Sequence, residues 1–157
     1  MIMPEYRKIF PSYDWDDAWL VNQIINLPEI LEPENIGFMK GVPNEEIKQN
    51  DNKIKEWIEE NMEKCSCLIL FCGEETYKSK WVKYEIELAR KLRKGRFIIY
   101  LKGLKRKDGT ICEKGIDPYE YHNLYSPTGY VIEKYNWNSD GKYKISDWIE
   151  DAISRVN

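Results

Sequence analysis

The sequence predicts a single doubly wound α/β domain, with a central, mainly parallel five-stranded sheet flanked by helices. Its 157 residues are most simply one domain, residues 1–157, and are enough to bury a sizeable core. Hydrophobic residues make up 42% and charged residues 32%, as in an ordinary globular protein rather than a disordered one. Short apolar runs alternate with helical patterns, which is typical of α/β folds. We therefore expect a flavodoxin-like strand order.

The chain begins with a strand and a helix. Residues 7–12 are the first strand candidate, and Pro11 should end it because proline donates no hydrogen bond to the ladder. Asp16 or Asp17 can open the next helix, whose apolar residues recur at helical spacing. This helix should stop before Pro28, because the residue before a proline is disfavoured in the α conformation.

A second unit contains the clearest strand of the chain. Residues 36–39 are a weak strand candidate, and residues 40–50 are a polar loop. The helix predicted over residues 51–64 has four apolar residues on one face, and Asp51 is a plausible cap. The continuous apolar run over residues 66–72 suits a strand of a sheet that is covered on both faces.

The third unit is a loop, a helix and a strand. Residues 73–78 form the loop, residues 79–94 have a helical pattern, and residues 96–101 form the fourth strand. Gly95 should end the helix, since glycine is common just beyond helix carboxyl ends.

The last third has weaker signals. Residues 102–118 are expected to be a loop, with a possible hairpin at Asp108 and Gly109. Residues 129–133 are the candidate for the fifth strand. Residues 145–156 should form the closing helix, with Trp148 among its inward side chains.

Charge and hydropathy exclude several classes of protein. The net charge of −3 gives no overall attraction to nucleic acid or to a membrane surface, so neither is expected as a partner. No apolar run approaches the roughly 20 residues that span a bilayer. The amino terminus lacks the form of a signal peptide, and a cytoplasmic location is expected.

The cysteine pattern makes a metal site improbable, and none is expected. No C-x-x-C pair is present, and His122 is the sole histidine. The four cysteines are interpreted as buried, reduced thiols and not as nucleophiles; they are Cys65, Cys67, Cys72 and Cys112.

Glu85 is the most informative residue. At 100° per residue it falls between Leu92 and Ala89, within the apolar arc of its helix, whereas Glu87 points to water. Burial of an unpaired carboxylate costs on the order of several kcal/mol. Two interpretations remain open from the pattern: a carboxylate satisfied by a core partner or the helix amino end, or an acid lining a cleft.

The carboxyl ends of the strands are where a ligand site is expected in such a fold. The loops there contribute hydroxyls, carboxylates and flat rings, a composition that suits planar bases and sugar hydroxyls. Beside Glu85, the candidate substrate-binding residues are Ser12, Tyr13, Asp14, Trp15, Ser79 and Trp81.

Structural roles compete with ligand binding at most of these positions. Trp81 lies on the apolar arc, where core packing is the more frequent role, and Ser79 is well placed as a helix cap. Tyr13 and Trp15 can simply pack at the edge of the first loop, and Asp14 can be a cap. The acidic first loop disfavours flavin mononucleotide, and the chain has neither G-x-G-x-x-G nor G-x-x-x-x-G-K-[ST].

Two segments carry a family resemblance: KIFPSYDWDD over residues 8–17 and LILFCGEETYKSKWVKYEIELA over residues 68–89. The second contains the pattern S-x-W-V-x-x-E-I-x-x-A, which is fairly specific. Weaker matches are DGTICEKGIDPY and YKISDWIEDAI, further along the chain. In this order the segments resemble a TIR-related domain, specifically the TIR-like group found in the Thoeris anti-phage defence system.

The resemblance implies an enzyme that takes NAD as its substrate, without a separate cofactor. Catalytic TIR domains cleave the nicotinamide–ribose bond with a glutamate in this helix, and Glu85 takes that position. In Thoeris the implied product is a cyclic ADP-ribose isomer that signals to a separate effector protein. The resemblance also implies that a homo-oligomer can form on activation. The alternative is a catalytically silent TIR-like module that acts by protein association, in which Glu85 is structural.

Overall fold

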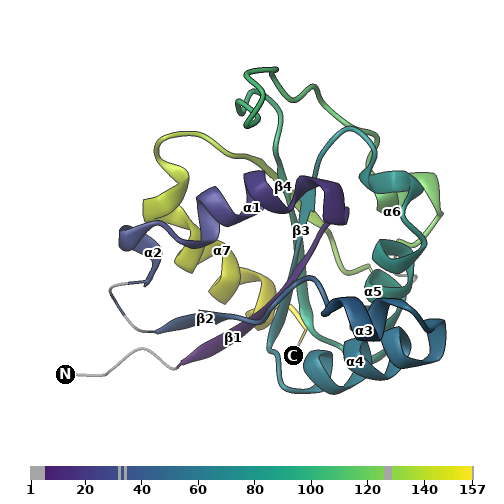
Figure 1. The fold of residues 1–157 in the computed structure, drawn as a ribbon. Helices are drawn as coiled ribbons and strands as arrows, with labels where there is room; N and C mark the ends of the chain where they lie inside the picture. Colours follow the sequence, from purple (N-terminus) through teal and green to yellow (C-terminus); the bar gives the residue numbers. More distant parts are fainter. Residues whose placement is uncertain (1–5, 32, 34, 126–128, 157) are drawn as a thin grey trace.

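The computed structural model describes residues 6–31, 33, 35–125 and 129–156. Five strands form one sheet in the order β2-β1-β3-β4-β5, and every pairing between them is parallel (Figure 1). This is the predicted flavodoxin-like order. The strands are β1 Arg7–Ser12, β2 Ile36–Phe38, β3 Cys67–Cys72, β4 Gly95–Tyr100 and β5 Glu133–Asn136.

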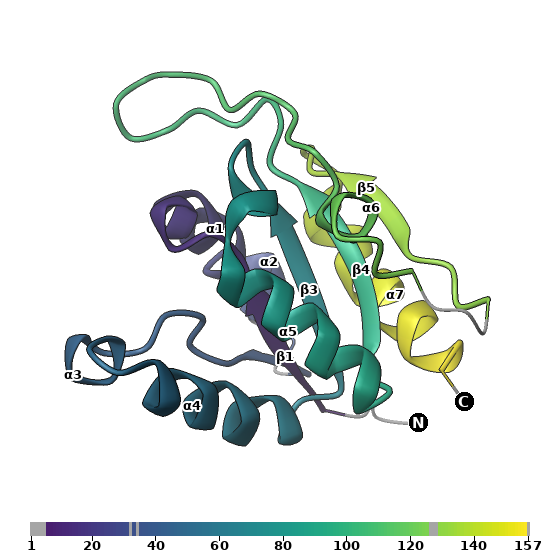
Figure 2. The ribbon, with the colours of Figure 1, turned by 90° about the vertical axis from the view of Figure 1, so that its right-hand side faces the viewer.

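Helices cover both faces of the sheet. On one face lie α1, α2 and α7, and on the other lie α4, α5 and α6 (Figures 1 and 2). The helices are α1 Ala18–Ile25, α2 Pro28–Leu31, α3 Glu45–Lys48, α4 Asp51–Glu63, α5 Lys80–Lys91, α6 Pro118–Tyr121 and α7 Gly141–Ser154, with the short 3-10 helices η1 Trp15–Asp17 and η2 Thr76–Lys78. Each face has its own hydrophobic cluster, so β3 is buried along its whole length, as its apolar run predicts.

Several helix boundaries predicted from the sequence were wrong, because the pattern of apolar residues gives little information about helix caps. Gly95 does not end α5: the left-handed residue is Arg93, with a φ of 56°, and Gly95 is the first residue of β4. Asn50, not Asp51, caps α4, through bonds from two backbone amides to its side-chain oxygen. The segment expected as a plain loop over residues 40–50 contains α3, which Asn44 caps.

The end of the chain also differs from the prediction. The fifth strand is β5, which shares only Glu133 with the predicted residues 129–133; it is an edge strand whose alternating, half-buried side chains give a weak signal. Helix α7 begins at Gly141, four residues before Ile145, and the short α6 was not predicted. The hairpin at Gly109 is confirmed by an antiparallel bridge between Lys105 and Ile111 and by a φ of 90° at Gly109.

The cysteines are all free and buried, as expected. Burial raises the pKa of the Cys65 and Cys72 thiols to about 12, which makes them poor nucleophiles. Within the described part of the chain, no helix is both long and apolar enough to cross a bilayer.

Candidate functional site

The centre of the candidate site is a contact between the last residue of β1 and the second turn of α5. The Ser12 hydroxyl donates a 2.7 Å hydrogen bond to Glu85 Oε1. Ser12 is fully buried and Glu85 is 2% exposed. Helix α5 is fixed here because the Ser79 side chain accepts a bond from the Val82 amide and so caps its amino end. The apolar arc predicted from the sequence therefore does bury Glu85.

Burial strongly disfavours the ionised form of Glu85. Desolvation raises the pKa of Glu85 to about 8, although the hydrogen bond from Ser12 acts in the opposite direction. No ion pair to Glu85 is found among the described residues, so neither a lysine nor an arginine neutralises it. At neutral pH the carboxyl is therefore mostly protonated.

Tyr13 is the third member of this centre. Its side chain is 5% exposed and its ring lies directly against Gly41, since a Cβ added at Gly41 would be 2.5 Å from Tyr13 Cε1. Burial, and secondarily the Glu85 charge, raise the pKa of Tyr13 to about 12. The structure therefore brings together Ser12, Tyr13 and Glu85.

The other predicted binding residues have visible structural roles. Asp14 caps η1 by accepting a bond from the Asp16 amide, and burial raises its pKa. Lys48 of α3 places its ammonium group 5.1 Å from the ring centre of half-buried Trp15. Trp81 packs in the core beside Tyr84, with ring centres 6.1 Å apart. For Ser79 and Trp81 these contacts match the structural roles that compete with ligand binding.

Asp17 is a buried carboxylate at the same edge, and the sequence predicted for it only a role in opening the first helix. It is 9% exposed, and a Cβ at Gly73 would lie 2.3 Å from its Oδ2. Burial, followed by the Asp14 charge, raises the pKa of Asp17 to about 6, while Arg106 opposes the shift. The signal was available, because Asp17 shares the apolar stripe of Leu20, Val21 and Ile24 at helical spacing.

A separate cavity of about 480 Å³ lies at the carboxyl ends of β4 and β5. It is lined by Tyr100, Lys114, Gly115, Ile116, Asp117, Glu120, Lys134 and Asn136, none of which is a predicted site residue. The Asp117 carboxylate already has three partners: it pairs with Lys134 at 2.6 Å and accepts hydrogen bonds from the Tyr125 hydroxyl and the Tyr119 amide. No cluster of acidic, histidine or cysteine side chains within the described ranges has the arrangement of a metal site.

Comparison with known proteins assigns the chain to a family. A model of the TIR-like domain of the Thoeris protein ThsB matches residues 10–106, more than half of the chain and the part that contains Ser12, Tyr13 and Glu85. The chain is also 31% identical over 158 residues to a Bacillus cereus (strain MSX-D12) protein named "Putative cyclic ADP-D-ribose synthase ThsB1". That alignment covers 96% of this chain and 80% of the relative. The chain belongs to the ThsB family of TIR-like domains.

Proposed function

We propose that this protein is a TIR-type enzyme that cleaves NAD at the nicotinamide–ribose bond and releases a cyclic isomer of ADP-ribose. The observation that carries the proposal is the buried Glu85 carboxyl, to which Ser12 donates a hydrogen bond and which no described cation neutralises. Membership of the family, and the name of the relative, support the same reaction. The product would act in anti-phage defence as a signal to a separate effector protein.

The chemistry requires one carboxylate and no strong acid. When the bond between ribose C1′ and the pyridinium nitrogen breaks, its electron pair leaves with nicotinamide, which departs as a neutral molecule. Positive charge then develops on the ribose, and a carboxylate beside it stabilises that charge or traps the cation covalently. Ordinary glycosidases need a second carboxyl group to protonate the leaving oxygen.

NAD itself supplies the charge that ionises Glu85. Burial holds the pKa of Glu85 near 8 in the free protein. A pyridinium cation beside the carboxyl favours its ionised form and lowers this pKa, and the proton passes to solvent. The Ser12 hydroxyl, which donates to Glu85 Oε1, holds the carboxylate in place and leaves its second oxygen for the ribose. We further propose that Tyr13, Asp14 and Trp15 line the path of the substrate, with Asp14 favouring the cationic ring.

A catalytically silent module that acts by association is the second candidate. It is favoured by the burial of the predicted site residues. Glu85 is 2% exposed, and Ser12, Tyr13 and Trp81 are each at most 9% exposed. NAD reaches the carboxyl only after neighbouring side chains move. In the silent module no such movement occurs, and the buried carboxyl has a purely structural role.

The test is separation and mass spectrometry of products from NAD incubated with the wild type, Glu85→Gln and Glu87→Gln. Glu87 is the matched control because it lies on the same helix, its side chain is 44% exposed, and its ion pair among the described residues is a long one, 3.9 Å from Lys83. Extract from phage-infected cells is added in parallel, so that a required trigger or assembly step is included. We expect nicotinamide and a product with the mass of ADP-ribose minus water from the wild type and Glu87→Gln alone. Intact NAD in every reaction, with folded proteins, would leave the association module.

A further inference from the structure

Glu74 joins the two sides of a loop that crosses the end of β3. The loop consists of residues 102–117 and is called the rim loop below. Glu74 Oε1 accepts a 2.9 Å bond from Arg106 Nη2 and a 2.7 Å bond from the Glu113 backbone amide. Arg106 precedes the hairpin turn and Glu113 follows it, with the Lys105–Ile111 bridge between the two strands of the hairpin. Backbone bonds between Gly103, Leu104 and Cys112 close the base of the hairpin itself. The single Glu74 carboxylate oxygen therefore ties both sides of the closed hairpin to the segment that follows β3.

Backbone contacts seat the rim loop on the end of β3 beside Glu74. A Cβ added at Gly115 would lie 1.9 Å from the Gly73 carbonyl oxygen, so the two glycines are in direct backbone contact. The Cys72 thiol lies 3.6 Å from the Ile116 carbonyl oxygen. No side chain fits between Gly115 and Gly73, so the backbone of the rim loop packs directly against the residue that follows β3.

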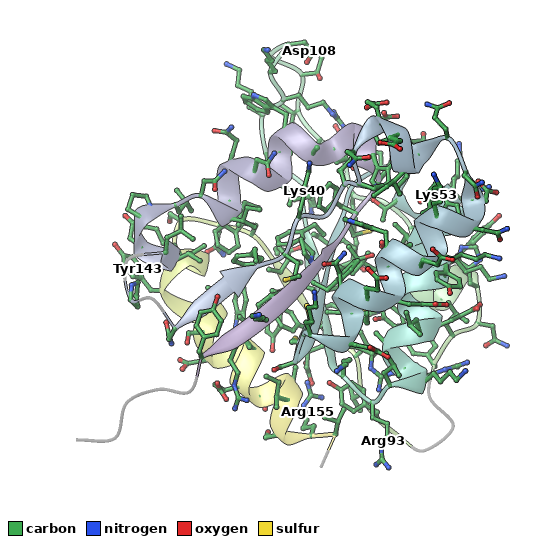
Figure 3. The ribbon with its side chains drawn as sticks, turned by 60° about the horizontal axis from the view of Figure 1, so that its bottom comes forward. Lys40, Lys53, Arg93, Asp108, Tyr143 and Arg155 are labelled. Atoms are coloured by element: carbon green, nitrogen blue, oxygen red, sulfur yellow. The ribbon has the colours of Figure 1, made fainter. Side chains whose placement is uncertain are left out.

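The hairpin of the rim loop extends toward the first loop of the candidate site. Arg106 lowers the pKa of buried Asp17, and Asp14 raises it, so these three charges lie near one another. Figure 2 shows the loop leaving β4 at the carboxyl edge of the sheet and extending over the side where α1 begins. Figure 3 shows Asp108 at its tip, away from the body of the domain. Arg106, which Glu74 holds, therefore lies near the loop that contains Tyr13 and Asp14.

We propose that Glu74 is a positioning residue that holds the rim loop over the NAD site and thereby favours cyclisation over hydrolysis. The inference rests on the proposed NAD-cleaving function. In both outcomes the bond from C1′ to the pyridinium nitrogen breaks and its electron pair leaves with nicotinamide. In hydrolysis a water oxygen bonds to C1′ and a proton is released. In cyclisation a nucleophilic atom of the same ADP-ribose bonds to C1′, and one proton is again released.

Exclusion of water decides between these two nucleophiles, because the intramolecular one is already in place while water must enter. Glu74 touches neither reacting atom in this scheme. Hydrogen bonds from the Glu113 amide and from Arg106 lower the pKa of Glu74, so its carboxylate is ionised at neutral pH and accepts both bonds. A loosened loop admits water without altering Glu85.

The test measures the ratio of cyclic to linear ADP-ribose produced by the wild type, Glu74→Gln and Glu74→Ala. Gln retains an acceptor for the Glu113 amide but loses the charge opposite Arg106, and Ala loses both. Glu75→Ala is the control, because Glu75 pairs only with exposed Lys78 among the described residues and does not contact the rim loop. Amide hydrogen exchange at Glu113 and its neighbours is recorded on the same proteins, and circular dichroism confirms folding.

We expect the ratio to fall by about threefold in Glu74→Gln and about tenfold in Glu74→Ala. These values lie at the lower end of the range for the loss of one and two ordinary hydrogen bonds, because the Arg106 and Glu74 side chains are partly exposed to solvent. Total nicotinamide release should change less than the ratio, and exchange at Glu113 should accelerate in the same order. An unchanged ratio in an active Glu74→Ala would overturn the positioning role and leave the NAD chemistry intact. No nicotinamide from the wild type in any condition would instead overturn the proposed function, and this inference with it.

Discussion

Burial favours the neutral form of Glu85 over the ionised form in the resting protein. Its hydrogen bond from Ser12 is short, but desolvation outweighs that bond and no cation in the described chain is paired with it. A carboxyl held by a cationic partner would have a lowered pKa, and its removal would break a structure-stabilising pair. The raised pKa of Glu85 has the opposite consequence, because its ionisation destabilises the resting fold.

Glu85→Gln should therefore stabilise the protein increasingly as pH rises. The wild-type carboxyl titrates near 4.5 when unfolded and near 8 when folded. The contribution of Glu85 to the free energy of unfolding is fully present below pH 4.5 and is lost as pH rises to 8. In this range the folded state holds a proton that the unfolded state has released. The loss is about 1.4 kcal/mol per pH unit in this window. Urea unfolding of both proteins at pH 5, 6.5 and 8 measures it, and a difference independent of pH would contradict the prediction.

Ser12→Ala should raise the pKa of Glu85 further. The hydroxyl favours the ionised carboxylate, and its removal is expected to shift the titration upward by about one unit, the equivalent of one hydrogen bond. The pH dependence of stability, referenced to the Glu85→Gln variant, gives the midpoint. Ser79→Ala is the control: it removes the cap of α5 at a cost of about 1 kcal/mol and should leave the Glu85 midpoint in place. Equal shifts in the two variants would exclude a direct role for Ser12.

Helical spacing revealed Glu85 but did not reveal its partner. A polar residue within an apolar helix face can be recognised from the sequence alone. The same helical spacing places Asp17 on the buried face that contains Leu20 and Ile24, so it could have identified Asp17 as well. Ser12 was placed at the correct edge because strand ends converge there. The contact between Ser12 and Glu85 spans 73 residues and depends on the packing of α5 over β1, which no local pattern contains.

At the scale of elements, prediction succeeded where burial or periodicity is strong. Helices α4 and α5 and strand β3 were located to within a few residues, because long amphipathic or continuous apolar patterns define them. The short α3 and α6 depend on one side-chain cap each, from Asn44 and Asp117, and such caps are common in loops as well. The fifth strand was predicted a few residues too early, because half of the side chains of edge strand β5 face solvent and its apolar signal is weak.

Gly41→Ala tests whether the segment between β2 and α4 determines the position of Tyr13. The added methyl group would overlap the ring, 2.5 Å from Cε1 and 2.7 Å from the hydroxyl, so the buried ring must move. We expect a loss of about 1–3 kcal/mol in stability, typical of overpacking, together with slower NAD cleavage. In a Tyr13→Ala background the same substitution should cost far less, since the obstructing ring is absent. Equal costs in the two backgrounds, measured by urea unfolding, would show that the contact is not limiting.

At the scale of the whole molecule, the proposed site lies at one end of the strands and the structural contacts of α7 with Gly95 lie at the other. Ser12, Gly73 and the rim loop lie at the carboxyl ends of the strands, whereas Arg93 lies at the opposite end from Asp108 in Figure 3. This polarity follows from parallel strands joined by crossover helices, and the sequence predicted it through alternating apolar and helical patterns. The hairpin contacts that hold the rim loop are irregular, and only the Asp108–Gly109 turn was visible beforehand.

Gly95→Ala should weaken the fold without altering the site. Gly95 begins β4 at the amino edge, where a Cβ would lie 2.9 Å from the Ile153 backbone nitrogen and 3.1 Å from the Ala152 carbonyl carbon. Because backbone atoms of α7 cannot turn aside as a side chain can, the helix must shift from the sheet, at a cost of about 1–3 kcal/mol. Exposed Lys91→Ala, at the end of α5, serves as the surface control. Urea midpoints should fall for Gly95→Ala alone, while the Glu85 titration and the ratio of cyclic to linear product stay at wild-type values. A change in either quantity would show that the packing of α7 at the amino edge is coupled to the chemistry at the carboxyl edge.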